Sequence, residues 1–467
     1  MTSGPREGLP TALRLASLAP PVLVTLLVAR YAVDVPFWDT WDWLDRHYPA
    51  EPASSDATMR RYWALFNDHR VFIPLLVDRL CLWASGIDIL PRIWLKLPLS
   101  IASFWLTLRL ARQTAPGAAL PWLGLALSCL AFPLTYWPLW VDPRQFSVHI
   151  VVLALMSALV AATSRRSPGT RAVLAAAACL VASLSYTPGL FTWPFVGLVL
   201  WGQPSRPSAP AMAVWAAGAM LLIGLHGVDL MNGATQAASA APHPLAAANA
   251  ALAIAGLPVA PALLPLAYLP TRLVGLCGVG ALAWLALAAW KRDGTARLHA
   301  LPWIALGGWG AAYALASGWA RGGLPLGALH DPRFAYLAAQ IWLAVAVLLA
   351  QYTALPPLGS GRPRRARLAV VASVVLAFSY GVASLRPFLA PGGIGRFTAT
   401  LEAGRECLLR FRTADSDCLA LLYPEPSRLR EIAARLQARD AAFLPLPQPD
   451  EATGPTSEPR EQQQPEQ

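Results

Sequence analysis

The chain has 467 residues, of which 56% are hydrophobic and only 13% are charged, and its mean hydropathy is +0.45. A soluble protein carries about 25% charged residues, so this composition excludes a soluble enzyme, and it also excludes extensive disorder. The 37 Lys and Arg outnumber the 26 Asp and Glu, a formal net charge of +11. These basic residues lie in short connections between apolar runs, which excludes a nucleic-acid-binding face. The sequence therefore predicts an all-α, polytopic membrane protein.

A transmembrane helix needs about 20 apolar residues to cross a bilayer. About eleven stretches approach this length, and the predicted spans are 12–33, 92–112, 119–140, 146–163, 172–186, 189–202, 211–228, 271–290, 301–319, 334–353 and 368–388. The first follows basic residues but lacks a good cleavage site, so it is interpreted as a signal anchor. The short pair 172–186 and 189–202 is either two crossings or one re-entrant hairpin. The proline-interrupted stretch 251–269 is predicted to be interfacial or re-entrant.

Most of the basic connections fall on one side of this predicted bundle. Together with the N-terminus, that side holds the connections containing Arg109, Arg165, Arg206, Lys291 and Arg364. The positive-inside rule assigns it to the cytoplasm, so the N-terminus is predicted inside and the C-terminus outside, in the bacterial cytoplasmic (inner) membrane. The outer side then holds a long first loop, 34–91, and the connections 141–145 and 320–333.

The chain is predicted to divide into three parts. Residues 1–388 form the transmembrane domain, 389–444 form a small extracytoplasmic segment, and 445–467, rich in Pro, Glu and Gln, form a disordered tail. In the extracytoplasmic segment, Cys407 and Cys418 are candidates for a disulfide, because an outside segment lies in an oxidising compartment. Two unpaired cysteines are the alternative.

The first outside loop begins with three aspartates spaced three residues apart, Asp39, Asp42 and Asp45. On a helix this spacing places them along one face, beside an apolar stripe suited to the membrane interface. An ordinary interfacial helix with a solvated acidic face explains the pattern. Because acids pressed against a membrane surface are costly unless they are used, the pattern also fits a functional site.

A second polar cluster, Asn67-Asp68-His69-Arg70, stands at the start of an apolar segment. Asn67 or Asp68 is expected to cap a helix. His69 and Arg70 fit a functional role and a packing role equally well.

Three arginines on the predicted outer side, Arg144, Arg321 and Arg333, oppose the positive-inside trend and need another explanation. Guanidinium is the preferred bidentate partner of phosphate, so these arginines are candidates to bind an anionic ligand, with His330 nearby. Pairing with loop acids or lipid headgroups is the alternative. Charged residues are nearly absent from the middle of the spans, which disfavours an ion-coupled transporter.

The first outside loop resembles that of the GT-C superfamily, integral membrane glycosyltransferases that use polyprenyl-phosphate-linked sugars. The matching motifs are Phe37-Trp38-Asp39-Thr40-Trp41-Asp42 just outside a span, then Arg70-Val71-Phe72-Ile73-Pro74-Leu75-Leu76 leading to Trp83-Ala84-Ser85-Gly86. The resemblance is to a bacterial branch that also carries paired cysteines near the C-terminus. It covers the architecture of most of the chain, but its motifs are confined to about residues 37–86. Here the acids are three apart instead of adjacent and one of two prolines is missing, so the cofactor is left open, with a divalent cation as one alternative.

The resemblance implies an inverting sugar transfer from a polyprenyl-phosphate donor to an acceptor on the outer face of the membrane. Asp39 would act as the base, and Asp42 would orient the acceptor or help to bind a divalent ion. The residues implied in binding the substrate and its phosphate are His69, Arg70, Arg144, Arg321, His330 and Arg333. The expected partners are the lipid-linked sugar and membrane lipids, with no nucleic acid, and the oligomeric state is left open.

Three alternatives to this function remain. A non-catalytic transporter or flippase of lipid-linked sugars would share the spans and the cationic outer loops. An O-antigen-ligase-like enzyme would use an undecaprenyl-diphosphate donor, but such ligases as a class place functional residues in a long late loop, whereas here the longest polar loop is the first. A structural envelope-assembly protein would have a dispensable acidic cluster.

Overall fold

The computed structural model describes residues 13–444 except for 52–53, 116–119, 233–242, 261–267, 293, 323–328, 330, 355–379, 382–383, 386–387 and 390–392. Every regular element within the described residues is a helix, and the one β feature among them is an isolated bridge between Phe66 and His69. The all-α prediction is confirmed for this part of the chain. The predicted span 368–388 lies largely outside it, and the predicted tail 445–467 lies outside it entirely.

The helices fall into three groups, and the helices of the first loop stand in the sequence between α2 and the rest of the bundle. The bundle contains α2 (Ala19–Tyr31), α6 (Leu90–Thr114), α7 (Leu120–Ala131), α8 (Pro138–Val141), α9 (Phe146–Ala162), α10 (Pro168–Ser183), α11 (Thr192–Gly202), α12 (Ala209–Asn232), α13 (Pro244–Gly256), α15 (Tyr268–Trp290), α16 (Gly294–Arg321) and α17 (Pro332–Ala354). Short 3-10 turns within it are η1 (Leu134–Tyr136), η2 (Pro143–Gln145) and η3 (Thr187–Phe191). The first loop contains α3 (Asp39–His47), α4 (Ser55–Trp63) and α5 (Phe72–Ser85), and the C-terminal segment contains α19 (Ile394–Leu408), α20 (Ser416–Ala420) and α21 (Pro426–Gln437).

Six described helices are long and apolar enough to cross a membrane, judged by length and composition. They are Leu13–Tyr31, Leu90–Thr114, Pro143–Ala162, Ala209–Asn232, Leu269–Trp290 and Pro332–Thr353. Shorter apolar helices lie between them, so the protein is a multi-pass membrane protein by these criteria. The predicted number of spans and their in–out order stay predictions.

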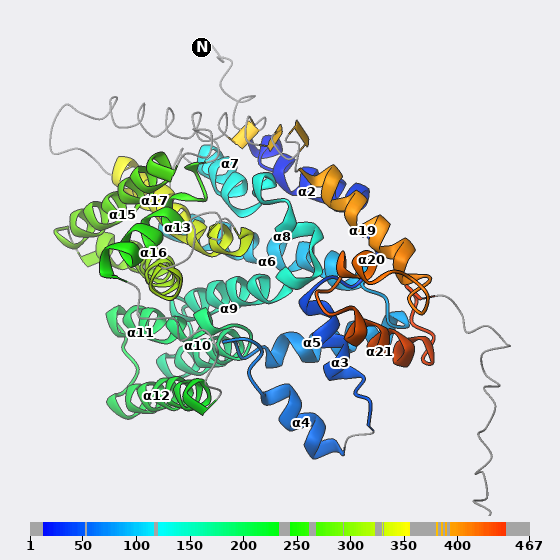
Figure 1. Cartoon of the computed structure of the whole chain (residues 1–467). Helices are drawn as coiled ribbons and strands as arrows, with labels where there is room; N and C mark the ends of the chain where they lie inside the picture. The colour runs from blue at the N-terminus through cyan, green and yellow to red at the C-terminus, as the bar shows by residue number, and fades with distance from the viewer. Residues whose placement is uncertain are drawn as a thin grey trace, which may run out of the picture.

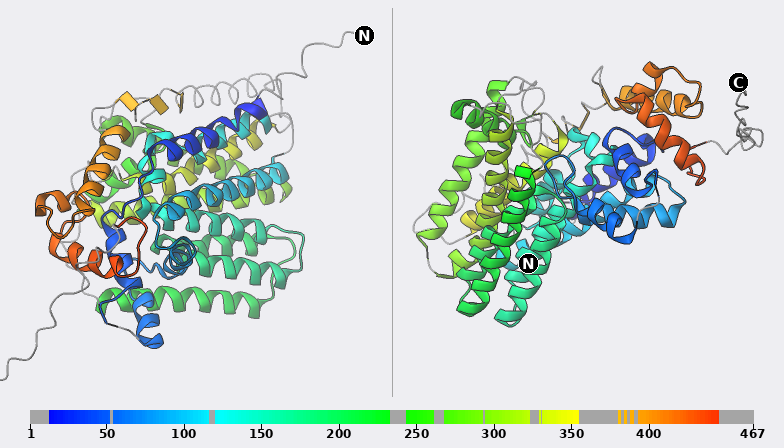
Figure 2. Two further views of the ribbon diagram at one scale, coloured as in Figure 1. Left: turned by 90° about the vertical axis from the view of Figure 1, so that its right-hand side faces the viewer. Right: turned by 60° about the horizontal axis from the view of Figure 1, so that its bottom comes forward.

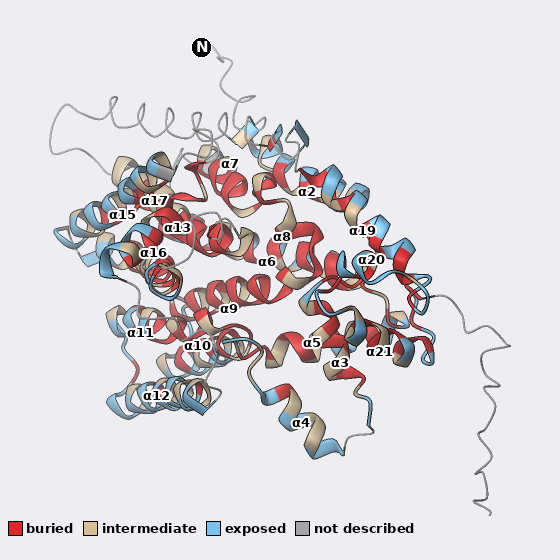
Figure 3. Ribbon diagram, viewed as in Figure 1, coloured by how far each residue is buried: buried red, intermediate tan, exposed pale blue. Residues whose placement is uncertain are grey.

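Two of these six helices form the centre of the bundle. Burial inside the protein covers 78% of the apolar window of Pro143–Ala162 and 72% of that of Pro332–Thr353, but only 11% of that of Ala209–Asn232. A helix that is apolar all round and buried belongs to a core, whereas the exposed apolar faces of α12 and α15 (Figure 3) suit contact with lipid. We call α9, with its leading turn η2, and α17 the central spans.

The first loop and the C-terminal segment lie together at one end of the bundle. Figures 1 and 2 show α3, α4 and α5 gathered there, with α21 beside α3 and α19 extending toward α2. A disulfide between Cys407 and Cys418 joins the end of α19 to α20. The N-terminal ends of the central spans, which carry Arg144 and Arg333, also lie at this end of the molecule.

Two glycines allow α13 and α15 to cross at very short range. A Cβ atom on Gly275 would lie 1.9 Å from the backbone oxygen of Leu252, and one on Gly256 would lie 1.9 Å from that of Thr271. Small residues at such crossings let membrane helices approach closely. Gly275→Ala is therefore expected to lower the free energy of unfolding by about 1–3 kcal/mol, seen as a lower Tm in detergent. Gly280→Ala on the same helix, with nothing within 4 Å of the new atom, is expected to leave the Tm unchanged, and an equal Tm for both variants would contradict the close crossing.

Candidate active site

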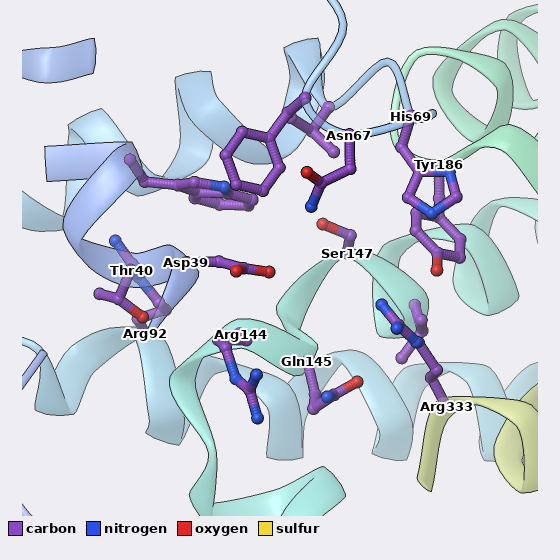
Figure 4. Close-up of a pocket in the computed structure, with 14 residues that line it drawn as sticks. Asp39, Thr40, Asn67, His69, Arg92, Arg144, Gln145, Ser147, Tyr186 and Arg333 are labelled. Atoms are coloured by element: carbon purple, nitrogen blue, oxygen red, sulfur yellow. The ribbon is translucent and has the colours of Figure 1, made fainter. Parts of the chain in front are cut away.

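One cavity brings together residues from four separate parts of the chain. Asp39 at the start of α3, His69 from the first loop, and Arg144 and Arg333 from the central spans all line it. Figure 4 shows the Asp39 carboxylate pointing into the cavity, with Arg144 and Arg333 on its other side and Gln145 between them. Four of the predicted site residues, more than 290 positions apart at the extremes, therefore meet at the end of the central spans.

The backbone is strained immediately before Asp39. Trp38 has a φ of +48°, and Asn67, which also lines the cavity, has a φ of +45°. Side chains other than glycine rarely adopt this region, and such strain persists where surrounding structure enforces it, often at functional sites. The backbone N–H of Trp38 donates to the carbonyl oxygen of Leu422 at 2.8 Å. The C-terminal segment thus fixes the residue that leads into Asp39.

The Asp39 carboxylate is half-buried beside two cations and does not bond to them. It accepts no hydrogen bond from the described residues, and burial raises its pKa above the ordinary value of 3.8, while the nearby Arg144 and Arg333 oppose this shift. A carboxylate with a raised pKa is a better base at neutral pH than an exposed one. Asp39 is therefore free to accept a proton from a bound molecule.

Arg144 and Arg333 are each held by an aspartate on their own turn. The Nε atom of Arg144 lies 2.9 Å and its Nη2 atom 2.6 Å from Oδ2 of Asp142. The Nε atom of Arg333 lies 3.0 Å from Oδ2 of Asp331. Arg144 also stacks over the ring of Phe37, with 5.0 Å between Cζ and the ring centroid. These contacts fix the orientation of both guanidinium groups at the cavity.

His69 is held as a neutral side chain. Its Nδ1 atom lies 2.8 Å from Oγ1 of Thr187, and its ring centroid lies 4.0 Å from that of Tyr186. Burial, together with Arg333 and Arg321, lowers the pKa of His69 to about 3. The imidazole is therefore uncharged at neutral pH, and it can contribute a hydrogen bond to a ligand but not a positive charge.

The other predicted site residues do not line this cavity. Asp42 faces the C-terminal segment, where its Oδ1 atom accepts from the Tyr423 hydroxyl at 2.8 Å and pairs with Arg428 at 3.1 Å. Arg70 forms an ion pair with Asp229 on α12 and stacks over a tryptophan. Asp42 and Arg70 therefore face other partners, Arg428 near the start of α21 and Asp229 on α12, and their roles in a site stay predictions.

The two remaining predicted residues are Arg321, at the end of α16, and His330, in the connection before α17. The guanidinium of Arg321 lies over the ring of Phe334, with Cζ 4.8 Å from the centroid. It is close enough to lower the pKa of His69, but it is not part of the cavity lining. His330 lies outside the described residues.

A buried network next to the cavity was not anticipated from the sequence. The Nε2 atom of His47 lies 2.9 Å from Oδ2 of Asp78, its Nδ1 atom lies 2.5 Å from the Tyr62 hydroxyl, and Nε of Arg92 lies 2.6 Å from Oδ1 of Asp78. Burial alone would raise the pKa of Asp78, but Arg92 and His47 hold it below its ordinary value. Arg92 also lines the cavity, so this network ties α3, α4, α5 and α6 together behind the site.

Comparison with known proteins gives a distant structural likeness. No protein-family model matches the sequence, and no characterised protein matches it at the sequence level. In structure, the chain is similar to the archaeal oligosaccharyltransferase AglB from Archaeoglobus fulgidus in complex with an inhibitory peptide and a dolichol-phosphate, with a TM-score of 0.44, 11% identity, and coverage of 86% of this chain and 58% of that one. It is also similar to the Archaeoglobus fulgidus oligosaccharyltransferase in complex with Zn and sulfate, with a TM-score of 0.45, 11% identity, and coverage of 93% and 62%. This chain spans less than two thirds of the length of either structure.

Proposed function

We propose that this protein is a membrane glycosyltransferase that moves a sugar from a polyprenyl-phosphate donor to an acceptor on the outer face of the cytoplasmic membrane. The observation that carries the proposal is the cavity at the ends of the central spans. There an unbonded carboxylate, Asp39, faces two oriented guanidinium groups, Arg144 and Arg333. In a sugar transfer from a phosphate, the attacking hydroxyl must lose a proton and the leaving phosphate gains negative charge. A base opposite two phosphate-binding cations meets both needs.

In the proposed reaction, Asp39 takes the proton from an acceptor hydroxyl while the hydroxyl oxygen attacks the anomeric carbon of the donor sugar. The bond between that carbon and the phosphate oxygen breaks, and the electron pair leaves with the lipid phosphate. Arg144 and Arg333 stabilise the charge that develops on this leaving group, because pre-oriented donors in a partly dehydrated site act without reorganisation. Neutral His69 and Asn67 border the same space and can hydrogen bond to the sugar.

A second, wider cavity supports a site for two substrates. It is lined by Trp63 at the end of α4, by Asn67, and by Asp229 at the end of α12. Asn67 borders both cavities, so a molecule in the wider one lies next to the space that Asp39 faces. We assign the acceptor to the wider cavity and the donor phosphate to the cavity at the ends of the central spans.

The proposed transfer is tested with the full chain reconstituted in liposomes. A panel of polyprenyl phosphoryl hexoses and pentoses is added with a membrane lipid extract as a source of acceptors, and release of polyprenyl phosphate is measured by mass spectrometry. Release that depends on the protein and on Asp39 is expected. Movement of a fluorescent lipid-linked sugar across the bilayer without release would overturn the proposal in favour of a transporter.

A matched variant controls this assay. Asp417 lies exposed on α20 and lines neither of the two cavities. Asp417→Asn makes the same chemical change as Asp39→Asn at a site without a cavity role. It is expected to retain full release, and equal losses in the two variants would count against a catalytic Asp39.

A further inference from the structure

The two arginines of the cavity belong to the same three-residue motif. Asp142-Pro143-Arg144 leads into α9 through η2, and Asp331-Pro332-Arg333 leads into α17. In each copy, Oδ1 of the aspartate accepts a hydrogen bond from the backbone N–H of the arginine, at 2.9 Å in the first and 3.0 Å in the second. An aspartate at the N-cap followed by proline is a strong helix start. Each aspartate therefore caps a central span and also pairs with the guanidinium two residues later.

The two motifs face one cavity from two different helices. Both arginines line it, and Figure 4 shows them on either side of Gln145. Their aspartates do not line the cavity, and each guanidinium is fixed by its own acid. A phosphate group between them would receive donors from both central spans.

The charges that line this cavity are already balanced by the protein. Arg144 and Arg333 each pair with the aspartate of their motif, Arg92 pairs with Asp78, and His69 is neutral. Asp39 adds a negative charge when it is ionised. The cavity therefore offers oriented hydrogen-bond donors with no net positive charge, so these donors alone offset the desolvation of a bound anion. A second negative charge adds a further desolvation cost that the lining does not offset.

One buried hydroxyl in the lining has no partner among the described residues. The Thr40 side chain is adjacent to Asp39, its residue is 1% exposed, and its Oγ1 atom makes no hydrogen bond. Buried polar atoms are normally satisfied, and an orphan at a cavity wall indicates a ligand atom that completes it. A phosphate oxygen is an acceptor for this hydroxyl.

We propose that the two Asp-Pro-Arg turns and Thr40 form a binding site for one singly charged phosphodiester group, so that the donor is a polyprenyl monophosphate sugar and a diphosphate-linked sugar is disfavoured. Asp142 and Asp331 are positioning residues that set both the orientation and the charge of the site. The assignment to a sugar donor rests on the proposed function. The preference for one phosphate charge concerns binding and can be measured without any turnover.

The binding preference is tested with the purified full chain in nanodiscs. Three probes with the same isoprenoid chain are compared: a polyprenyl phosphoryl hexose, a polyprenyl diphosphoryl hexose and the free polyprenol. We expect the phosphoryl hexose to bind roughly tenfold or more tightly than either of the others, as one or more charge-assisted hydrogen bonds contribute. Equal or tighter binding of the diphosphoryl hexose would overturn the proposal.

Variants of the two aspartates give the sharper test. The proposal predicts that they change the selectivity between the two phosphate ligands and do not only weaken binding. Asn caps a helix as well as Asp does, so Asp142→Asn and Asp331→Asn keep the helix start but release one positive charge into the cavity. Each is expected to shift the ratio of affinities toward the diphosphoryl hexose by about tenfold. A lower Tm is expected for Asp142→Asn, because Asp142 is buried and is the counter-ion of Arg144. Asp417→Asn, at an exposed aspartate that lines neither cavity, is expected to leave the ratio unchanged. An unchanged ratio in both cavity variants would overturn the role of the motif.

Thr40→Val tests the orphan hydroxyl with almost no change of shape. It is expected to weaken binding of the phosphoryl hexose by roughly three- to tenfold and to leave polyprenol binding unchanged. Equal weakening of both probes would show a packing effect and would remove Thr40 from the site. If the binding preferences hold but no donor is turned over, the proposed transferase function fails while the phosphate site stands. If turnover occurs with diphosphate-linked donors, the site assignment fails while the transferase function stands.

Discussion

Replacement of Asp39 by Asn is expected to reduce the rate of sugar transfer by about 10²- to 10⁴-fold without loss of the fold. Asn keeps the size of the side chain but cannot accept the proton of the attacking hydroxyl. Donor binding is expected to be retained, since Arg144 and Arg333 do not bond to the Asp39 carboxylate among the described contacts. The measurement is the rate of polyprenyl phosphate release from reconstituted wild-type and variant protein, and a variant with more than half of the wild-type rate would exclude Asp39 as the base.

Asp39→Asn is expected to stabilise the fold or leave its stability unchanged, even though it lowers the rate of transfer. Burial raises the pKa of Asp39 above its ordinary value of 3.8, so the folded protein binds a proton there more tightly than the unfolded chain. Such a group destabilises the fold at a pH above its folded pKa, and this cost vanishes as the pH falls below the unfolded value. Asp39→Asn is therefore expected to have an equal or higher Tm than the wild type at neutral pH, with the difference shrinking on acidification. A Tm well below that of the wild type would mean that native contacts stabilise the carboxylate.

The raised pKa also predicts the pH profile of transfer. A base acts in its ionised form, so the rate is expected to fall as the pH drops through the pKa of Asp39, at a pH above the ordinary value for aspartate. Because His69 titrates only near pH 3, it is not expected to shape the profile at neutral pH. An acidic limb at or below pH 3.8, the ordinary value for aspartate, would assign the base to an exposed carboxylate and not to Asp39.

The sequence was sufficient to single out the residues that meet in the cavity, but not to show that they meet. Arg144 and Arg333 stand out because arginine on the predicted outer side opposes the topological trend, and Asp39 because an acid at the predicted membrane surface is costly. Their convergence depends on the packing of the central spans at the centre of the bundle. Hydropathy reports that a helix is apolar, but not which apolar helices are neighbours.

The contacts of other candidate residues could not be predicted from the sequence, because their partners are distant along the chain. Asp42 seemed equivalent to Asp39 by spacing, yet the Tyr423 hydroxyl, 381 positions away, determines which way it faces. Arg70 fitted a functional role and a packing role equally well in the sequence, and its ion pair is with Asp229, 159 positions away. Local spacing predicts the face of a helix on which a residue lies, and tertiary packing decides what that face contacts.

The buried network behind the cavity gives the largest predicted effect on stability. The side chains of Asp78 and Arg92 are 0% and 2% exposed, and Asp78 receives two donors from Arg92 and one contact from His47. Asp78→Leu would leave the Arg92 charge buried without its counter-ion, which is expected to lower the free energy of unfolding by about 3–5 kcal/mol. The measurement is the Tm and the yield of folded protein in detergent.

A double variant separates the cost of an unpaired charge from the loss of favourable contacts. Replacing a whole buried ion pair by apolar residues of similar volume is often neutral or stabilising, because the desolvation penalty of both charges disappears. Asp78→Leu combined with Arg92→Met is therefore expected to recover most of the lost stability, even though it removes more polar contacts than the single change. Recovery of the fold without recovery of transfer would show that Arg92, which also lines the cavity, is kept for the site and not for the fold. A double variant as unstable as the single one would instead place the stability in the hydrogen bonds that link His47 to α5.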